Sequence, residues 1–284
     1  MKSTCFVLEG GALRGLYTSG VLDYLYEEKV DTDCIIGVSA GALFGVNYFS
    51  DQPGRVLRYN LKYCNDKRYM SVRSLLLTGN IVNKSFAYYK VSYKLDPFDE
   101  KKFINTNKDF YAVLTNVETG LPEYVKITKP LEQMEELRAT SAMPFVTRIV
   151  NVNGKKYLDG AVSDSIPVLK ALEMNYDKVV VVLTQPYEYR KKELTGKELK
   201  KAMKKYDKYP YFVKDLFERP KMYNETLEKI IELEKEGRIF VLRPSESVEI
   251  NPIKKDENDL KRAYNLGKKD AKANYKKLIK YLKQ

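Results

Sequence analysis

The sequence predicts an α/β fold, a three-layer α/β/α sandwich in which helices cover a mainly parallel central sheet. Two short apolar segments, 4–8 and 34–36, are each followed by a glycine-containing turn and then by a helical pattern. This strand–helix–strand order favours parallel strands, because the connecting helix must return across one face of the sheet. A third segment, 178–183 (KVVVVL), has the continuous hydrophobicity of a strand that is buried on both faces.

The remaining elements follow from hydrophobic periodicity and from turn residues. In the first part of the chain we expect a strand at 4–8, a helix over 16–29, a strand at 34–36, a helix over 42–49 and mostly helical chain over 54–108. In the second part we expect a hairpin-like pair at 110–115 and 123–127, strands at 156–158, 178–183 and 238–242, helical patterns after Pro186 and a long helix over 257–283. Because no low-complexity linker or repeat interrupts this order, the sequence favours one domain, 1–284, ending in a lysine-rich helical extension within 176–284.

Composition excludes several classes of protein. No stretch approaches the roughly 18 uncharged apolar residues of a membrane-spanning helix, and the first nine residues lack a secretory leader pattern, so we expect a cytoplasmic protein. The three cysteines, Cys5, Cys34 and Cys64, form no paired metal-ligand spacing, so neither a disulfide framework nor a metal site is expected. Cys5 and Cys34 are interpreted as small buried hydrophobes.

The chain contains no histidine. This absence excludes Ser-His-Asp triads, Cys-His pairs and histidine metal sites in one step. Any acid–base chemistry must therefore come from carboxylate, lysine, tyrosine or cysteine side chains.

Positive charge is concentrated near the C-terminus. The net charge is +12, and residues 254–284 alone hold eleven Lys/Arg against four Asp/Glu, a net +7. In the expected last helix an apolar stripe (Leu260, Tyr264, Gly267, Ala271, Tyr275, Leu278, Leu282) runs beside a lysine face (Lys261, Lys268, Lys269, Lys272, Lys276, Lys280, Lys283). The lysines are either simply solvated or also attract an anionic membrane, so peripheral membrane contact remains open. Nucleic acid is not expected, because the lysines lack the interleaved aromatic pattern of nucleic-acid-binding modules.

A possible nucleophile lies at the end of the second strand. Gly37-Val38-Ser39-Ala40-Gly41 is a G-x-S-x-G sequence between a predicted buried strand and a predicted helix, the context that a nucleophile elbow requires. The glycines permit a strained turn, and the N-terminus of the helix points its positive end at the serine. Ser39 is therefore the candidate nucleophile, with a packing turn of small residues as the alternative.

A glycine loop follows the first strand. The sequence Gly10-Gly11-Ala12-Leu13-Arg14-Gly15 opens a helix, and its backbone N–H groups have the placement needed to hold a phosphate or an oxyanion. Nucleotide binding of the G-x-G-x-x-G type is disfavoured, because Ala12 replaces the second glycine and no acidic residue follows at the required separation.

A serine nucleophile without histidine needs another base at a strand end. Asp159 follows the strand 156–158 and precedes Gly160 and Ala161, small residues that let another backbone come close. From these residues alone, an ordinary Asp-Gly turn stays open as the alternative.

Together these blocks resemble the patatin-like phospholipases. The glycine loop 10–15, the elbow 37–41, the Asp159-Gly160-Ala161 triplet and a fourth segment, 139–144 (ATSAMP), occur in the order and spacing of that family across about residues 5–175. The resemblance implies a patatin-like catalytic core with a Ser39–Asp159 dyad. It also implies an oxyanion hole at Gly10, Gly11, Ala12 and Leu13, supported by Arg14, Gly15, Gly37, Ala40, Gly41, Gly160 and Ala161.

The implied activity is hydrolysis of a phospholipid or another acyl ester, of the phospholipase A or lysophospholipase type, without metal or cofactor. One departure from the family is Ala12 in place of a third glycine, which costs about 1 kcal/mol if the position needs a positive φ. An aspartate near its reference pKa of about 3.9 is a weak base, so burial must raise that pKa or the dyad hydrogen bond must be short. A carboxylesterase for small esters and a lipid-binding module with a decayed site remain alternatives.

Overall fold

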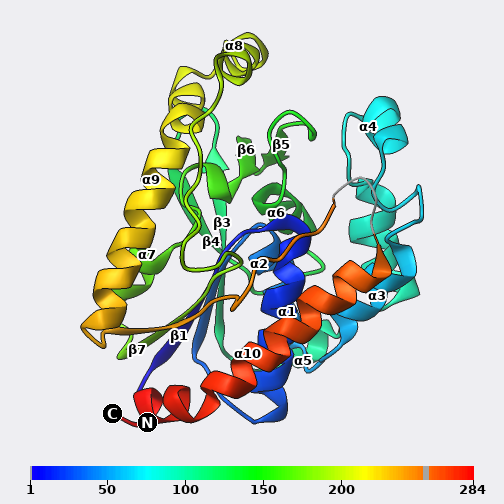
Figure 1. Ribbon diagram of the computed structural model, residues 1–284. Helices are drawn as coiled ribbons and strands as arrows, with labels where there is room; N and C mark the ends of the chain where they lie inside the picture. The colour runs from blue at the N-terminus through cyan, green and yellow to red at the C-terminus, as the bar shows by residue number, and fades with distance from the viewer. Residues whose placement is uncertain (1, 252–255) are drawn as a thin grey trace.

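A computed structural model describes residues 2–251 and 256–284 and contains an eight-stranded sheet between two layers of helices (Figure 1). The strands are β1 (Thr4–Leu8), β2 (Cys34–Val38), β3 (Asp109–Asn116), β4 (Pro122–Lys126), β5 (Val150–Val152), β6 (Lys155–Asp159), β7 (Lys178–Val182) and β8 (Ile239–Leu242). Their spatial order is β5-β6-β3-β2-β1-β7-β8, with β4 paired to β3. The predicted α/β class is confirmed.

The sheet is parallel through its centre and antiparallel at one end. Strands β3, β2, β1, β7 and β8 pair in parallel, which confirms the predicted arrangement. Strands β4 and β6 run antiparallel to β3, and β5 runs antiparallel to β6. The sequence predicted the β3–β4 hairpin but not β5, because three residues are too short for a recognisable alternation.

Side chains of successive strand residues enter two separate cores. In β1, Phe6 and Leu8 join one apolar cluster while Cys5 and Val7 join the other. The first cluster packs under α1 (Gly15–Glu27), α2 (Ala40–Phe49), α3 (Arg55–Tyr63) and α10 (Glu257–Lys283). The second packs under α7 (Val168–Glu173) and much of α9 (Pro210–Lys235). Helices therefore cover both faces, as Figure 1 shows.

The long C-terminal helix α10 has the predicted bounds and lies across α1 (Figure 1). The two backbones nearly touch where glycines meet: a Cβ added at Gly20 would lie 2.0 Å from the Tyr264 carbonyl oxygen, and one at Gly267 would lie 2.1 Å from that of Tyr17. Leu260, Tyr264, Ala271 and Leu278 of the predicted stripe are buried, whereas Tyr275 and Leu282 are partly buried.

The segment between α3 and β3 is helical, as predicted, but irregular. It contains α4 (Val72–Thr78), the π-helix η2 (Lys84–Leu95) and α5 (Glu100–Asn105).

Helix α8 (Gly196–Lys205) begins with a capping box between Thr195 and Glu198. Two short helices, α6 (Met134–Thr140) and α7, were not predicted, because one to two turns carry too little periodicity to identify.

Candidate active site

Ser39 lies on a sharp turn between β2 and α2, with φ 54° and ψ −120°. The turn is possible because Gly37 and Gly41, two positions before and after Ser39, carry no side chain. A Cβ at Gly37 would lie 2.6 Å from the Ala42 Cα, and one at Gly41 would lie 2.5 Å from the Leu8 carbonyl oxygen. Both distances are far below van der Waals contact, so the two glycines of the motif are required by packing.

Asp159 lies beside Ser39 although the two residues are 120 positions apart in the chain. The Ser39 hydroxyl donates a 2.8 Å hydrogen bond to Asp159 Oδ2, and the Ala161 N–H donates one of 2.9 Å to Oδ1. Antiparallel pairing of β6 with β3 sets Asp159 opposite Leu114, near the end of β3 and next to the elbow. Gly160 is needed because a Cβ there would lie 2.0 Å from the Val113 carbonyl oxygen.

The protein environment makes Asp159 a stronger base than a free aspartate. Burial raises the pKa of its carboxyl group above the usual value, since desolvation disfavours the charged form. The Ala161 N–H and then the Arg219 guanidinium oppose that rise without cancelling it. An aspartate base needs either a pKa raised by burial or a short hydrogen bond to the serine, and Asp159 has the raised pKa together with a 2.8 Å hydrogen bond.

The glycine loop after β1 passes directly beside the elbow. A Cβ at Gly10 would lie 3.1 Å from the Ser39 Cβ, tighter than an ordinary van der Waals contact, so glycine favours this close approach. Ala12 is the first residue of the 3₁₀ turn η1 (Ala12–Arg14) and has φ 48°. This is the positive φ at which alanine, in place of glycine, is strained. Among the described residues, the N–H groups of Gly10, Gly11 and Ala12 donate to no acceptor, whereas the Arg14 N–H donates to the Gly11 carbonyl oxygen.

Thr140 is a residue of the site whose contact the sequence did not identify. Its hydroxyl oxygen accepts a 2.9 Å hydrogen bond from the Ser39 N–H, and its O–H donates one of 2.6 Å to the Val113 carbonyl oxygen. The following Ala142 carbonyl oxygen accepts the Asp159 N–H at 3.0 Å. The segment 139–144 therefore ties the elbow to the Asp159 strand, and only the family resemblance had drawn attention to it.

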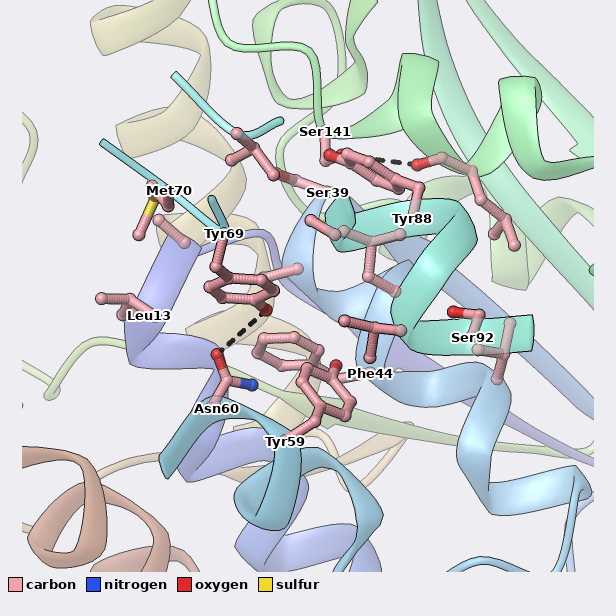
Figure 2. Close-up of a pocket in the computed structure, with 18 of the residues that line it drawn as sticks. Leu13, Ser39, Phe44, Tyr59, Asn60, Tyr69, Met70, Tyr88, Ser92 and Ser141 are labelled. Carbon is pink, nitrogen blue, oxygen red and sulfur yellow. Dashed lines mark hydrogen bonds between the residues drawn. The ribbon is translucent and has the colours of Figure 1, made fainter. Parts of the chain in front are cut away.

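An apolar cavity of about 320 Å³ opens at Ser39. The cavity is lined by the glycine loop, α2, α3, η2, α6 and the chain between α3 and η2. The lining residues include Leu13, Phe44, Tyr59, Tyr69 and Tyr88 (Figure 2). Two of the three phenol groups have polar partners: the Tyr69 hydroxyl donates to Asn60 at 3.3 Å, and the Tyr88 hydroxyl lies 2.9 Å from the Ser141 hydroxyl. The cavity therefore presents mainly hydrocarbon, in the size range of small-molecule sites.

A second, more polar cavity of about 440 Å³ lies on the Asp159 side of Ser39. Arg14, Lys191 and Arg219 line it together with Tyr223. Arg14, one of the residues expected to support the motif, lines both cavities. Gly15, another of them, packs against Ala40 and Phe44, and a Cβ added there would lie 2.9 Å from the Ala40 Cβ. Periodicity in the sequence did not connect Lys191 or Arg219 with the serine.

The cysteines are unbridged and buried, Cys5 and Cys34 as predicted. In residues 2–251 and 256–284 no group of three His, Cys, Asp or Glu side chains is placed to hold a metal ion. Within the same part of the chain, no helix combines the length and apolar character that a membrane span requires.

Comparison with known proteins gives two family matches and several relatives. The family model for "Patatin-like phospholipase" matches residues 6–172, and one for a "Domain of unknown function (DUF6363)" matches residues 209–283. The chain is 29% identical over 184 residues to "Uncharacterized protein YjjU" of Escherichia coli (strain K12), which covers 63% of this chain and 51% of that protein. It is 42% identical over 50 residues to "Uncharacterized protein L620" of Acanthamoeba polyphaga mimivirus, which covers 16% of this chain and 13% of that protein.

These matches are partial, since the chain spans about half the length of YjjU and less of L620. Among solved structures, VipD from Legionella pneumophila aligns with a TM-score of 0.45 and 12% sequence identity. That alignment covers 96% of this chain and 66% of the VipD chain.

Proposed function

The chain belongs to the patatin-like phospholipase family, and on that premise we propose that it hydrolyses carboxylic esters of lipids with Ser39 as nucleophile and Asp159 as base. The proposed substrates are phospholipids or lysophospholipids. The observation that carries the proposal is the 2.8 Å hydrogen bond from Ser39 Oγ to Asp159 Oδ2 at the mouth of an apolar cavity. Membership of a family does not by itself identify the ester that is cleaved, because one fold can serve many substrates, and this geometry supplies the support for the proposal.

In the first step, Asp159 takes the proton of the Ser39 hydroxyl while Ser39 Oγ attacks the ester carbonyl carbon. The existing hydrogen bond already defines the donor, the acceptor and the direction of transfer. Burial favours the protonated form of Asp159 that results, because the charge on its carboxylate is neutralised.

The negative charge that develops on the carbonyl oxygen needs hydrogen-bond donors. The N–H groups of Gly10, Gly11 and Ala12 lie in the loop beside Ser39 and have no acceptor within the described chain. Donors held by the fold in advance stabilise an oxyanion without a cost of reorganisation at the moment of reaction. We assign these groups, with Leu13, to the oxyanion hole.

Collapse of the tetrahedral intermediate breaks the ester bond, and protonated Asp159 returns its proton to the departing alcohol. The acyl group stays on Ser39 Oγ as an ester. Water then attacks that ester while Asp159 again accepts a proton. The bond to Ser39 Oγ breaks, Asp159 returns its proton to that oxygen, and the fatty acid is released. These reaction steps require neither metal nor cofactor.

The apolar cavity favours a lipid over a small hydrophilic ester. Its lining of leucine, phenylalanine and tyrosine side chains suits a hydrocarbon chain, whereas a short ester would leave most of that surface uncovered. A binding module with a decayed site is less consistent with a serine hydroxyl still bonded to a buried carboxylate.

Labelling with a fluorophosphonate probe, which reacts covalently with activated serines, tests the proposal. Wild-type protein should be labelled and should hydrolyse a p-nitrophenyl ester, and Ser39→Ala should lose both properties. Ser163→Ala is a matched control, because Ser163 is a hydroxyl near the site that bonds to Thr115 instead of a carboxylate. Labelling that persists in Ser39→Ala would contradict the assignment of the nucleophile.

A further inference from the structure

The second cavity contains three cations from three distant parts of the chain. Arg14 comes from the turn after β1, Lys191 from the segment after β7, and Arg219 from α9. Ser39 and Asp159 line the same cavity, so these cations border the proposed reaction centre.

None of the three side chains forms an ion pair or a hydrogen bond with another residue in the described chain. The Nε atoms of Arg14 and Arg219 are buried without a partner, and the Lys191 ammonium lies over the Tyr223 ring at 4.5 Å from its centroid. Several other arginines form ion pairs, for example Arg190 with Glu228 and Arg138 with Glu135. Unpaired donors away from water are costly, so the cavity presents unused capacity for an anion.

The carboxylates that line this cavity, Glu9 and Asp159, are already engaged. Glu9 accepts hydrogen bonds from the Tyr223 hydroxyl and the Thr184 N–H, and burial raises its pKa. Asp159 is bonded to Ser39 and Ala161. Both carboxylates attract the cations through space, but neither forms an ion pair or a hydrogen bond with them in the described chain.

The cations also repel one another. Burial, followed by the neighbouring charge of Arg219, lowers the pKa of Lys191 to about 8. The nearby charges of Glu9 and Asp159 oppose this decrease only in part, and an anion bound between the cations would oppose it further.

We propose that this cavity binds a phosphate group of the substrate, so that the enzyme prefers acyl esters with a phosphate near the ester to neutral acyl esters. The proposal rests on ester hydrolysis at Ser39. With the acyl chain in the apolar cavity, the carbonyl carbon lies at Ser39 and the phosphate lies on the Asp159 side. Guanidinium groups suit this role, because their planar N–H pairs match two oxygens of one phosphate.

Arg219 gives the C-terminal region a part in this site. It lies inside the segment 209–283, which matches the domain of unknown function, and beyond the segment 6–172, which matches the phospholipase family. The C-terminal region therefore contacts the substrate through Arg219.

The test compares two short-chain substrates with the same acyl group, 1-acylglycerol 3-phosphate and 1-monoacylglycerol, each below its micelle concentration. Monomeric substrates remove any attraction of the basic protein to an anionic surface. We expect wild-type kcat/KM to be about 10- to 100-fold higher for the phosphate ester, the effect of one or two charged hydrogen bonds. Inorganic phosphate should inhibit hydrolysis of the phosphate ester competitively.

Arg219→Gln should reduce that preference about tenfold or more, and Arg219→Lys should restore part of it by keeping the charge. Lys221→Gln is the matched control, because this exposed lysine lies on the same helix and its loss changes the net charge equally. Binding of inorganic phosphate to the Ser39→Ala protein, measured by calorimetry, gives a readout that does not need activity, and Arg219→Gln in that background should weaken it.

Equal kcat/KM for the two substrates in wild-type protein would overturn the proposal, whether or not Arg219→Gln folds. If inorganic phosphate inhibited hydrolysis of both substrates equally, and the enzyme did not prefer either substrate, the cavity would be a site for the free anion. This result would also overturn the proposal. Failure of the proposed function looks different: neither substrate is hydrolysed and Ser39 is not labelled by a fluorophosphonate.

Discussion

At the scale of single residues, the elbow and the glycine loop each hold a non-glycine residue in a backbone conformation that it disfavours. Ser39 has φ 54° and Ala12 has φ 48°, and each such conformation costs on the order of 1–3 kcal/mol. Contacts around Ser39 offset the cost, since Thr140 bonds its N–H and Gly37 and Gly41 let the neighbouring chain close over the turn. Strain at this position projects the hydroxyl toward Asp159.

Asp159→Asn should separate activity from stability. Removal of the base is expected to lower kcat for a p-nitrophenyl ester by about 10²- to 10⁴-fold. Because burial raises the pKa of Asp159 in the folded state, that state binds more protons than the unfolded chain between the two pKa values. The free energy of unfolding therefore falls as pH rises through this window, and the ionised carboxylate opposes folding near neutral pH.

The asparagine variant should accordingly have an equal or higher Tm than wild type near neutral pH, and the difference should shrink under acid conditions. In wild type, kcat/KM should rise with pH through the raised pKa of Asp159, without an imidazole limb near pH ~6.5. Near-wild-type turnover in Asp159→Asn would show that another group is the base.

At the scale of elements, the crossing of α1 and α10 depends on two glycines that face each other's backbone. Gly20 packs on the carbonyl of Tyr264, and Gly267 packs on that of Tyr17. Hydrogen bonds and ion pairs flank the crossing: the Tyr264 hydroxyl donates to Asp23 at 2.7 Å, and Lys268 pairs with Glu27 at 2.6 Å. The close approach fixes the C-terminal helix against the layer that carries the glycine loop.

Gly267→Ala should destabilise the protein by about 1–3 kcal/mol or more, because its Cβ would overlap a backbone oxygen that cannot rotate away. The sign is informative, since alanine in place of glycine inside an exposed helix normally stabilises by about 0.5–1 kcal/mol. Denaturant unfolding measures the change. Gly196→Ala at the start of α8, where a Cβ meets nothing within 4 Å, is the control and should be neutral or stabilising. Equal effects of the two substitutions would contradict the tight crossing.

At the scale of the whole molecule, the chain after residue 175 is joined to the rest through one continuous sheet. Strand β7 pairs with β1, and β8 extends the sheet from β7. The same part of the chain carries α10, whose apolar stripe is mostly buried against the core. Burial leaves open whether its lysine face also contacts a membrane, since both interpretations require the stripe to be buried.

Vesicle co-sedimentation addresses that question. If the lysine face attracts membranes, binding should require anionic lipid and weaken with salt, and each lysine near the surface should contribute about 1 kcal/mol. Glutamine at Lys269, Lys272, Lys276 and Lys280 should then weaken binding strongly. Lys268 is left in place because it is paired with Glu27.

The control variant carries glutamine at Lys197, Lys200, Lys204 and Lys208, exposed lysines on or just after α8, which Figure 1 shows far from α10. It loses the same charge and should bind nearly as wild type does. Equal binding to neutral and anionic vesicles, or equal losses in the two variants, would leave α10 a structural role. If replacing the exposed Leu76 and Leu77 of α4 abolished vesicle binding, the membrane contact would instead lie at α4.

The sequence by itself determined the α/β class, the parallel centre of the sheet and the family. Strands β1, β2 and β7 are buried on both faces, so their continuous apolar runs stand out, and α10 is long enough for its periodicity to define both ends. The absence of histidine excluded imidazole chemistry, and the elbow and the Asp159 triplet, through the family resemblance, predicted a serine nucleophile with a carboxylate base. These features are local, and local patterns are what a sequence displays directly.

Only the tertiary structure decided which distant side chains meet. The contact of Thr140 with Ser39, the two cavities and the convergence of Arg14, Lys191 and Arg219 depend on strand order and on where α9 crosses the sheet. The glycines of the α1–α10 crossing likewise acquire their role from a partner more than 200 residues away in the chain. The physical reason is that packing and desolvation depend on distance in space, and a chain folded around a parallel sheet brings together residues whose separation in sequence carries no signal.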